Sequence, residues 1–256
     1  MDNLHIVDVC AEDLYEYGII CISDENHPGY KPRMRWLVQR FNEGLKIKLL
    51  KLNDKKIGYI EYIPGEYAWR AIDAPGYMVI HCIWVYPIRY RGLGYGSWLL
   101  SACAEDANKQ HMSGIAVVAN SGALRPDSRL FLKTGFNIVE SSGHYNLLVK
   151  NFRSGERPRF NNWEDRLREY QGLHMVYCNQ CPMISKAALE LSRVAYNEGY
   201  DMQLDELRSA AEVQHAPSGF GTFSIVNDGK LLVDHYIGES QFKSIIREHV
   251  YSPAIV

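Results

Sequence analysis

The sequence predicts an α/β protein of two domains, on three observations. First, 256 residues at about 150 residues per domain correspond to about 1.7 domains. Second, segments with the apolar periodicities of strands and helices alternate along the chain in two separate series. Third, a polar stretch rich in arginine, Asn151 to Gln171, separates the two series. We therefore expect domains at residues 1–150 and 172–256, joined by a linker at 151–171.

The first series is expected to follow the order β-α-α-β-β-β-α-β-α-β-β. A loop rich in Trp, Tyr and Arg is expected at Pro64–Pro75. The expected strands are Leu4–Val9, Leu45–Leu52, Lys56–Ile63, Met78–Tyr86, Ile115–Ala119, Phe136–Glu140 and Tyr145–Val149. The expected helices are Ala11–Cys21, Pro32–Phe41, Gly94–Lys109 and Ser128–Thr134.

The second series is expected to follow the order β-α-β-α-β-β-α. Asn227-Asp228-Gly229 is a strong signal for a hairpin turn between its last two strands. The expected strands are Leu173–Tyr177, Tyr200–Leu204, Thr222–Val226 and Lys230–Tyr236. The expected helices are Pro182–Asn197, Ser209–Gln214 and Ser240–Val250, and a short amphipathic helix around Trp163 is expected in the linker.

Composition excludes several classes of protein. Apolar residues make up 46% and charged residues 23% of the chain, which excludes a disordered chain, a collagen and a coiled-coil rod. The net charge of −2 gives no basic face, so we expect no nucleic-acid partner. No apolar run approaches the ~20 residues of a membrane span, so we expect no membrane partner. The N-terminus lacks a leader pattern, so we expect a cytoplasmic protein; the sequence gives no indication of its oligomeric state.

A glycine-rich loop, Arg91-Gly92-Leu93-Gly94-Tyr95-Gly96, separates an expected strand from an expected helix. Glycines let the backbone turn sharply and approach a ligand closely. The unpaired N–H groups and the dipole at the start of the helix favour an anion such as a pyrophosphate. The plainer interpretation is a tight turn from strand to helix.

The loop resembles the acyl-CoA motif Arg/Gln-x-x-Gly-x-Gly/Ala of the GNAT family of N-acetyltransferases. Strand Val79–Val85 precedes it, Asn120 ends the next strand, and Lys133-Thr134-Gly135-Phe136 is similar to the closing Gly-Phe signature of that family. The resemblance implies a mixed-sheet domain that binds acetyl-CoA. It also implies direct attack of an amine on the thioester, with a small molecule or peptide as the amine acceptor.

The resemblance also implies roles for individual residues. The backbone of Ile83, Trp84 and Val85 would hold the pantetheine arm, and Asn120 and Phe131 would lie near the cofactor. The pyrophosphate would be held by Arg91, Gly92, Leu93, Gly94, Tyr95, Gly96 and Ser97.

His81 is the candidate general base, since imidazole titrates near neutral pH, and it is expected to share a sheet face with Val79 and Ile83. The alternative is a structural histidine inside the sheet. Phe131 occupies the position at which many relatives carry a tyrosine acid. The hydroxyls of Tyr145 and Ser128 are therefore the candidate donors, and the alternative is protonation of the thiolate by solvent.

The loop between the third and fourth expected strands is a candidate acceptor site. Glu66 would attract an amine, Arg70 would bind a carboxylate, and Trp69 would supply an aromatic surface. An ordinary surface loop with one aromatic anchor explains the same residues equally well.

The second domain contains a spaced thiol pair, Cys178-Asn179-Gln180-Cys181-Pro182, between a strand and a helix. A thiol at the start of a helix is expected to have a lowered pKa. The motif and the element order resemble those of thioredoxin-like proteins, although Gly221 stands where those proteins have a proline. A site for interaction, or a metal site completed by His174 and His215, is an alternative, but we expect no metal.

The two domains together resemble the YoaP-type acetyltransferases. The resemblance lies in Gln180-Cys181-Pro182, Glu212–Ser218 and Asp234–Ile237. Two other classes of function stay open: a thiol redox protein with a CoA-sensing domain, and a non-catalytic acyl-CoA-binding protein.

Overall fold

The computed structural model describes residues 3–120 and 128–250. It divides into two compact units, each built from segments that are not contiguous in the chain. The first unit comprises Met1–Ser23, Leu37–Ala68 and Ile72–Phe160, and the second comprises Asp24–Trp36, Trp69–Ala71 and Asn161–Val256. The second unit therefore includes two short segments that chain order alone places in the first domain.

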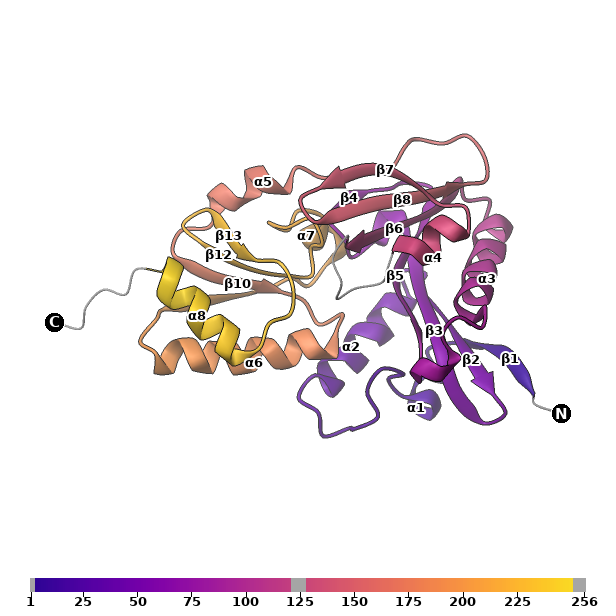
Figure 1. Cartoon of the computed structure of the whole chain (residues 1–256), viewed down its shortest axis with the longest axis horizontal. Helices are drawn as coiled ribbons and strands as arrows, with labels where there is room; N and C mark the ends of the chain where they lie inside the picture. The colour runs from indigo at the N-terminus through magenta and orange to yellow at the C-terminus, as the bar shows by residue number, and fades with distance from the viewer. Residues whose placement is uncertain (1–2, 121–127, 251–256) are drawn as a thin grey trace. The chain divides into compact units, whose positions relative to one another are not determined.

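A mixed seven-stranded sheet forms the centre of the first unit (Figure 1). The order of its strands is β1-β2-β3-β5-β6-β8-β7. β5 and β6 are parallel, and every other pair of neighbours is antiparallel. The strands are β1 (Leu4–Val9), β2 (Lys46–Leu52), β3 (Lys55–Pro64), β5 (Tyr77–Val85), β6 (Gly114–Asn120), β7 (Asn137–Ser142) and β8 (Tyr145–Asn151).

Among the described residues, three α-helices, two short 3-10 helices and the end of a fourth α-helix accompany these strands; the start of that fourth helix, up to Trp36, belongs to the second unit. They are α1 (Leu14–Tyr17), α2 (Tyr30–Phe41), η1 (Gly65–Tyr67), η2 (Ile88–Tyr90), α3 (Tyr95–Lys109) and α4 (Ser128–Lys133). The expected helix Ala11–Cys21 is wrong for most of its length. It is reduced to α1 because Gly18, with φ of 61°, ends the helix in a conformation that side chains disfavour.

The core of the first unit lies between the sheet and helix α3, which crosses β2, β3, β5 and β6. Leu99, Cys103 and Ala107 of α3 pack against apolar residues of these strands, and Phe131 of α4 completes the cluster. The apolar residues of α3 recur every three to four positions, so one face of the helix is buried while Glu105 and Lys109 stay exposed.

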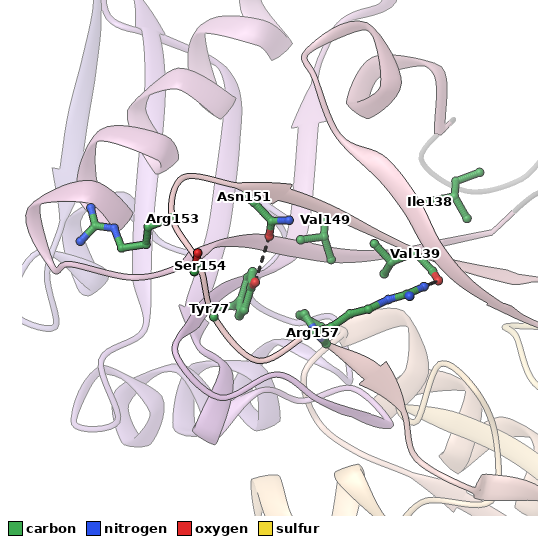
Figure 2. Close-up of a pocket in the computed structure, with 10 residues that line it drawn as sticks. Tyr77, Ile138, Val139, Val149, Asn151, Arg153, Ser154 and Arg157 are labelled. Carbon is green, nitrogen blue, oxygen red and sulfur yellow. Dashed lines mark hydrogen bonds between the residues drawn. The ribbon is translucent and has the colours of Figure 1, made fainter.

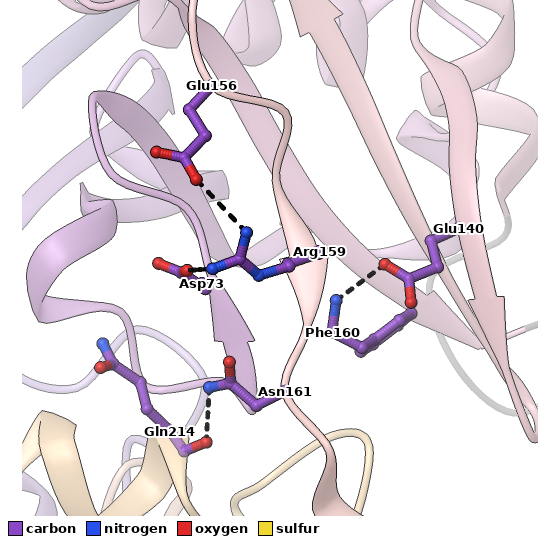
Figure 3. Close-up of polar contacts among 7 residues, drawn as sticks. All are labelled: Asp73, Glu140, Glu156, Arg159, Phe160, Asn161 and Gln214. Carbon is purple, nitrogen blue, oxygen red and sulfur yellow. Dashed lines mark hydrogen bonds and ion pairs between the residues drawn. The ribbon is translucent and has the colours of Figure 1, made fainter.

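A short ribbon joins two distant parts of the first unit. Strand β4 (Ile72–Asp73) pairs antiparallel with β9 (Arg159–Phe160). The carboxylate of Asp73 lies 2.5 Å from the Arg159 guanidinium, and Phe160 N–H donates to the Glu140 carboxylate at 2.9 Å (Figure 3). The expected loop Pro64–Pro75 and the expected linker 151–171 thus each contain a strand.

The second unit contains a four-stranded sheet in the order β11-β10-β12-β13. β10 and β11 are parallel, and the other neighbours are antiparallel. Its elements are α5 (Trp163–Arg166), η3 (Leu167–Glu169), β10 (Leu173–Tyr177), α6 (Pro182–Asn197), β11 (Met202–Glu206), α7 (Ala210–Gln214), β12 (Phe223–Asn227), β13 (Lys230–Val233) and α8 (Glu239–His249). From β10 to α8 the expected order β-α-β-α-β-β-α is confirmed.

Helices α6 and α8 pack together against one face of this sheet (Figure 1). Ile184 and Leu191 of α6 and Phe242 of α8 are buried against Met175 and Ile225 of the strands. Helix α6 begins at a proline, whose missing N–H would have no intrahelical partner at that position. Among the described residues, no helix is long and apolar enough to cross a membrane.

Candidate functional site

The neighbouring strands β5 and β6 pair over only part of their length. Their ladder runs from Tyr77 opposite Gly114 to Ile80 opposite Val117. Ile83, Trp84 and Val85 lie beyond the last pair, and on their other side β5 continues to pair with β3. The edge of β5 that faces β6 is therefore the place where an extended ligand can hydrogen-bond to strand backbone. The three residues expected to hold pantetheine lie along this edge.

The glycine loop connects the end of β5 to the start of α3. Gly92 and Gly94 have φ of 82° and 85°, a region that residues with side chains rarely adopt. A Cβ built at either glycine meets no atom within 4 Å among the described residues. The side chain of Arg91 reaches back to β5, where its Nε donates to the carbonyl of Val85 at 3.2 Å. The loop is thus turned sharply, open at its surface and tied to the strand before it.

The first backbone N–H groups of helix α3 lie next to this loop and have no hydrogen-bond partner within the helix. Its first intrahelical bond runs from Trp98 N–H to the carbonyl of Gly94, at 3.0 Å. By helix geometry, the N–H groups of Tyr95, Gly96 and Ser97 have no intrahelical acceptor. They lie at the positive end of a 15-residue helix. The stretch from Arg91 to Ser97 therefore combines a sharply turned, open loop with unpaired N–H groups at the start of a helix, a geometry that favours an anion.

His81 lies in a β-bulge where β5 leaves β6. Cys82 is opposite Glu61 and Ile80 is opposite Tyr62, so His81 is the additional residue of β5. The bulge interrupts the alternation of side chains between the two faces of the sheet. Ile80 and Ile83 are three residues apart, yet both pack into the core against α3. The expectation that His81 shares a face with Ile83 is therefore wrong, because one inserted residue reverses the face.

His81 forms a buried pair with Glu61. The distance from His81 Nδ1 to Glu61 Oε1 is 3.5 Å, and the two side chains are 0% and 1% exposed. A carboxylate beside the ring is suited to orient the imidazole of a general base. Sequence reasoning missed Glu61. Its signal is a carboxylate placed between Ile60 and Tyr62 in an otherwise apolar strand.

The candidate donor lies at the far end of β6. Tyr145, only 1% exposed, begins β8 directly opposite Asn120. The structure therefore places these two expected site residues together. The hydroxyl of Ser128, the second candidate donor, is buried and has no hydrogen-bond partner among the described residues. Phe131 is fully buried and packs edge-to-face on Phe136 at 5.4 Å. Phe131 thus packs in the core of the first unit.

The expected acceptor residues separate between the two units. Glu66 belongs to the first unit, is exposed, and accepts a hydrogen bond from Gly76 N–H at 2.9 Å. Trp69 and Arg70 belong to the second unit and are 1% and 2% exposed. The alternative of an ordinary surface loop is wrong for Trp69 and Arg70, because Trp69 packs edge-to-face on Trp36 at 5.1 Å and Arg70 stacks on Phe220.

The thiol pair lies at the start of α6 in the second unit. Cys178 is fully buried, whereas Cys181 is the partly exposed N-cap of the helix. Burial raises the pKa of Cys178 to about 12, although the backbone N–H of Gln180 and the charge of Arg70 act in the opposite direction. The expected lowering of this pKa is therefore wrong. Desolvation of a thiolate outweighs the favourable position at a helix start.

The two histidines proposed as further metal ligands are engaged elsewhere. His174 Nδ1 lies 2.7 Å from the Asp205 carboxylate, and its Nε2 lies 2.9 Å from the carbonyl of Gln171. His215 Nδ1 lies 2.8 Å from the carbonyl of Ala211. In the described part of the chain, no three His, Cys, Asp or Glu side chains are grouped so as to hold a metal ion.

A cavity of about 530 Å³ lies in the first unit, away from the glycine loop (Figure 2). Tyr77, the first residue of β5, lines it and donates from its hydroxyl to Asn151 at 2.9 Å. The guanidinium of Arg157 also lines it and donates to the carbonyl of Val139. The glycine loop instead follows the last residue of β5, about 25 Å along the strand. The cavity is therefore not part of the site at Arg91–Ser97.

Comparison with known proteins agrees with this geometry. Residues 11–136 match the family model of the Acetyltransferase (GNAT) family. The chain is 27% identical over 248 residues to a protein of Bacillus subtilis strain 168 called uncharacterized N-acetyltransferase YoaP, covering 94% of this chain and 97% of YoaP. The first part of the chain is thus a GNAT acetyltransferase domain, and the protein is an acyltransferase. The coverage shows that its similarity to YoaP extends into the second unit.

The chain also shows some likeness to solved structures. The IAA acetyltransferase of Bacillus cereus is 18% identical, with a TM-score of 0.41 and coverage of 59% of this chain and 100% of its own. The yncA structure from Salmonella typhimurium, determined with its cofactor acetyl-CoA, is 18% identical, with a TM-score of 0.44 and coverage of 61% and 98%.

Proposed function

We propose that this protein transfers the acetyl group of acetyl-CoA to the amine of a small molecule or peptide. The observation that carries the proposal is that β5 and β6 stop pairing before the end of β5, which is followed by an open glycine loop. This arrangement offers strand backbone for the pantetheine arm and helix N–H groups for the pyrophosphate. The family match to residues 11–136 supports it.

The residues present fit such a ligand. Gly92 and Gly94 leave open space where a phosphate would approach, and a Cβ there would extend into it. Ile83, Trp84 and Val85 present backbone beyond the β5–β6 ladder. Asn120 and Tyr145 lie together at the end of the neighbouring strand. When bound, acetyl-CoA supplies a thioester whose carbonyl carbon an amine attacks, forming a C–N bond and breaking the C–S bond.

We assign the proton transfers to two residues of this domain. His81 takes the proton that the amine loses, and Glu61 stabilises the imidazolium that results. Tyr145 donates a proton to the departing thiolate sulfur. The thiolate is a good leaving group, so the donor contributes less to the rate than the base does.

Replacement of the base tests this assignment. For His81→Ala we expect kcat/KM for acetylation of an amine to fall about 10²–10⁴-fold, the usual contribution of a general base. The dissociation constant for acetyl-CoA should stay the same, because the glycine loop and the backbone of β5 hold the cofactor. The measurement is the release of CoA thiol with a panel of primary amines, together with calorimetric titration of acetyl-CoA.

A matched control is His111→Asn, on an exposed histidine with φ of 57° that asparagine tolerates. It should leave both quantities unchanged. Glu61→Gln should lower kcat less than His81→Ala does. An unchanged rate for His81→Ala at neutral pH would remove His81 as the base. Binding of acetyl-CoA without turnover of any amine would contradict the transferase assignment.

A further inference from the structure

We propose that the second unit binds a small carboxylate at the start of helix α6, at a site formed by Gln180, Arg70 and Arg33. This site is independent of acyl transfer in the first unit.

The first observation is a buried hydrogen-bond donor. Gln180 is 8% exposed, and its side chain lies two residues before the start of α6. Its Oε1 accepts from Arg70 Nη1 at 2.6 Å, which fixes the orientation of the carboxamide. Its Nε2 is buried and has no hydrogen-bond partner among the described residues. Buried donors without acceptors are rare in folded proteins, so this one points to an acceptor that binds from outside the chain.

The second observation is a buried guanidinium bonded to the same carboxamide. Arg70 is 2% exposed, and its Nη1 also donates to the carbonyl of Trp69 at 2.5 Å. The guanidinium lies 4.1 Å from the centre of the Phe220 ring. These three contacts fix the plane of the group. A fixed planar cation with several N–H donors is suited to a carboxylate.

The third observation is a second cation held near by. Arg33 is 5% exposed, and its guanidinium lies 4.6 Å from the ring of Trp36. One turn before it, Gly29 packs directly on Pro182: a Cβ at Gly29 would lie 2.0 Å from the carbonyl oxygen of Pro182. This approach places the start of α2 beside the first turn of α6. The positive charges of Arg70 and Arg33 both act to lower the pKa of Cys178, against the larger effect of burial.

Helix α6 itself contributes to the site. It has 16 residues, so its positive end lies at Cys181 and Pro182. A Cβ at Gly221, whose φ is 84°, would lie 3.0 Å from the backbone nitrogen of Ala71, so the loop before β12 packs closely on the residue that follows Arg70. The donors, the two cations and the helix dipole all favour a negatively charged group with oxygen acceptors. A carboxylate has two such oxygens and is small enough for a mostly buried site.

Cys181 provides a direct probe, because it caps α6 and is partly exposed. Iodoacetate is itself a small carboxylate, while iodoacetamide is its neutral counterpart. The proposal predicts that Cys181 in the full chain reacts with iodoacetate at a rate that saturates with concentration. The ratio of the iodoacetate rate to the iodoacetamide rate should fall about tenfold or more in Gln180→Leu, because losing a hydrogen bond to a charged group usually weakens binding by about that factor. Acetate should protect Cys181 competitively.

Peptide mass spectrometry follows each cysteine separately, and exposed Cys10 serves as the internal reference. Arg70→Met should lower the ratio as Gln180→Leu does, and Arg208→Met, on an exposed arginine, should not. Circular dichroism confirms that each variant is folded. Equal ratios in the wild type and in folded Gln180→Leu, or no protection by acetate, would overturn the proposal. Protection by inorganic phosphate as strong as that by acetate would overturn the assignment to carboxylates.

Discussion

At the scale of single residues, burial decides what the ionisable side chains can do. Cys178 and His81 are both buried, but different groups surround them. Desolvation opposes the ionisation of the Cys178 thiol and raises its pKa to about 12. His81 has the carboxylate of Glu61 at 3.5 Å in the same buried environment. A motif shows where such a residue lies in the chain, but its chemistry depends on neighbours that are distant in sequence.

We predict that Cys178 is unreactive at neutral pH. Because its pKa is raised, the thiol stays protonated as pH increases from about 6 to about 9, the range in which a free cysteine with a pKa of about 8.5 ionises. Alkylation by iodoacetamide, followed at each cysteine by mass spectrometry, should show no midpoint for Cys178 in this range. A midpoint near 8.5 or lower would contradict the burial argument and favour a redox role for the pair.

At the scale of elements, a buried polar cluster fastens helix α3 to the sheet. The Asp106 carboxylate of α3 accepts from the Tyr62 hydroxyl at 2.7 Å and lies 3.0 Å from Lys48 Nζ. Burial acts to raise the pKa of Asp106, but these two partners outweigh it, so the net pKa is lowered. The glycine loop is the N-terminal end of the same helix. The cluster therefore also fixes the direction of α3 where the helix follows the glycine loop.

We predict that Asp106→Ala lowers the free energy of unfolding by about 2 kcal/mol, because a hydrogen bond to a charged group typically contributes about that much. The melting temperature should fall by several degrees. Because folding lowers this pKa, the stabilisation is present above the unfolded value of about 4 and is lost as pH falls through the folded value. The difference in melting temperature from the wild type should thus disappear in acid.

Asp8→Ala is the matched control for this measurement. Its carboxylate also contacts Lys48, at 2.5 Å, but its side chain is 75% exposed. Exposed ion pairs contribute little, so its melting temperature should stay close to that of the wild type. Equal effects of the two substitutions would contradict the role given to the buried cluster.

Local sequence patterns predict the elements that depend on local chemistry. Helix α6 runs from Pro182 to Asn197, as expected from its proline start and apolar period. The glycine loop and the start of α3 are likewise within a residue of expectation. The bulge at His81 and the pairing with Glu61 were not predictable, because they depend on how β3 and β5 align. An inserted residue in a strand leaves no mark in an apolar sequence.

At the scale of the whole molecule, the chain does not divide where its composition changes. Asp24–Trp36 and Trp69–Ala71 belong to the second unit. They are held there by side chains such as Trp36, Trp69 and Arg70 and by the close approach of Gly29 to Pro182. No local pattern marks these segments, because each has the composition of an ordinary loop or helix end. The sequence therefore predicts the elements of the second unit but not all of its parts.

We predict that a fragment of residues 161–256 is markedly less stable than the second unit within the full chain. It lacks the Trp36–Trp69 pair and the Arg70 contacts to Gln180 and Phe220. Loss of buried aromatic side chains costs about 3–5 kcal/mol each. Urea unfolding followed by circular dichroism measures the difference. A cooperative transition at the same midpoint as in the full chain would show that the two inserted segments are dispensable.

The most direct test of the account is the melting temperature with and without acetyl-CoA, for the wild type, Gly94→Asp and Gly199→Asp. At about 100 times its dissociation constant, a ligand adds about 2.7 kcal/mol, a shift of several degrees. Gly199 has φ of 81° and open space, like Gly94 at 85°, so both variants carry similar backbone strain. The account predicts a shift for the wild type and Gly199→Asp and none for Gly94→Asp. An equal shift in all three, or none in the wild type, would contradict the cofactor site at the glycine loop.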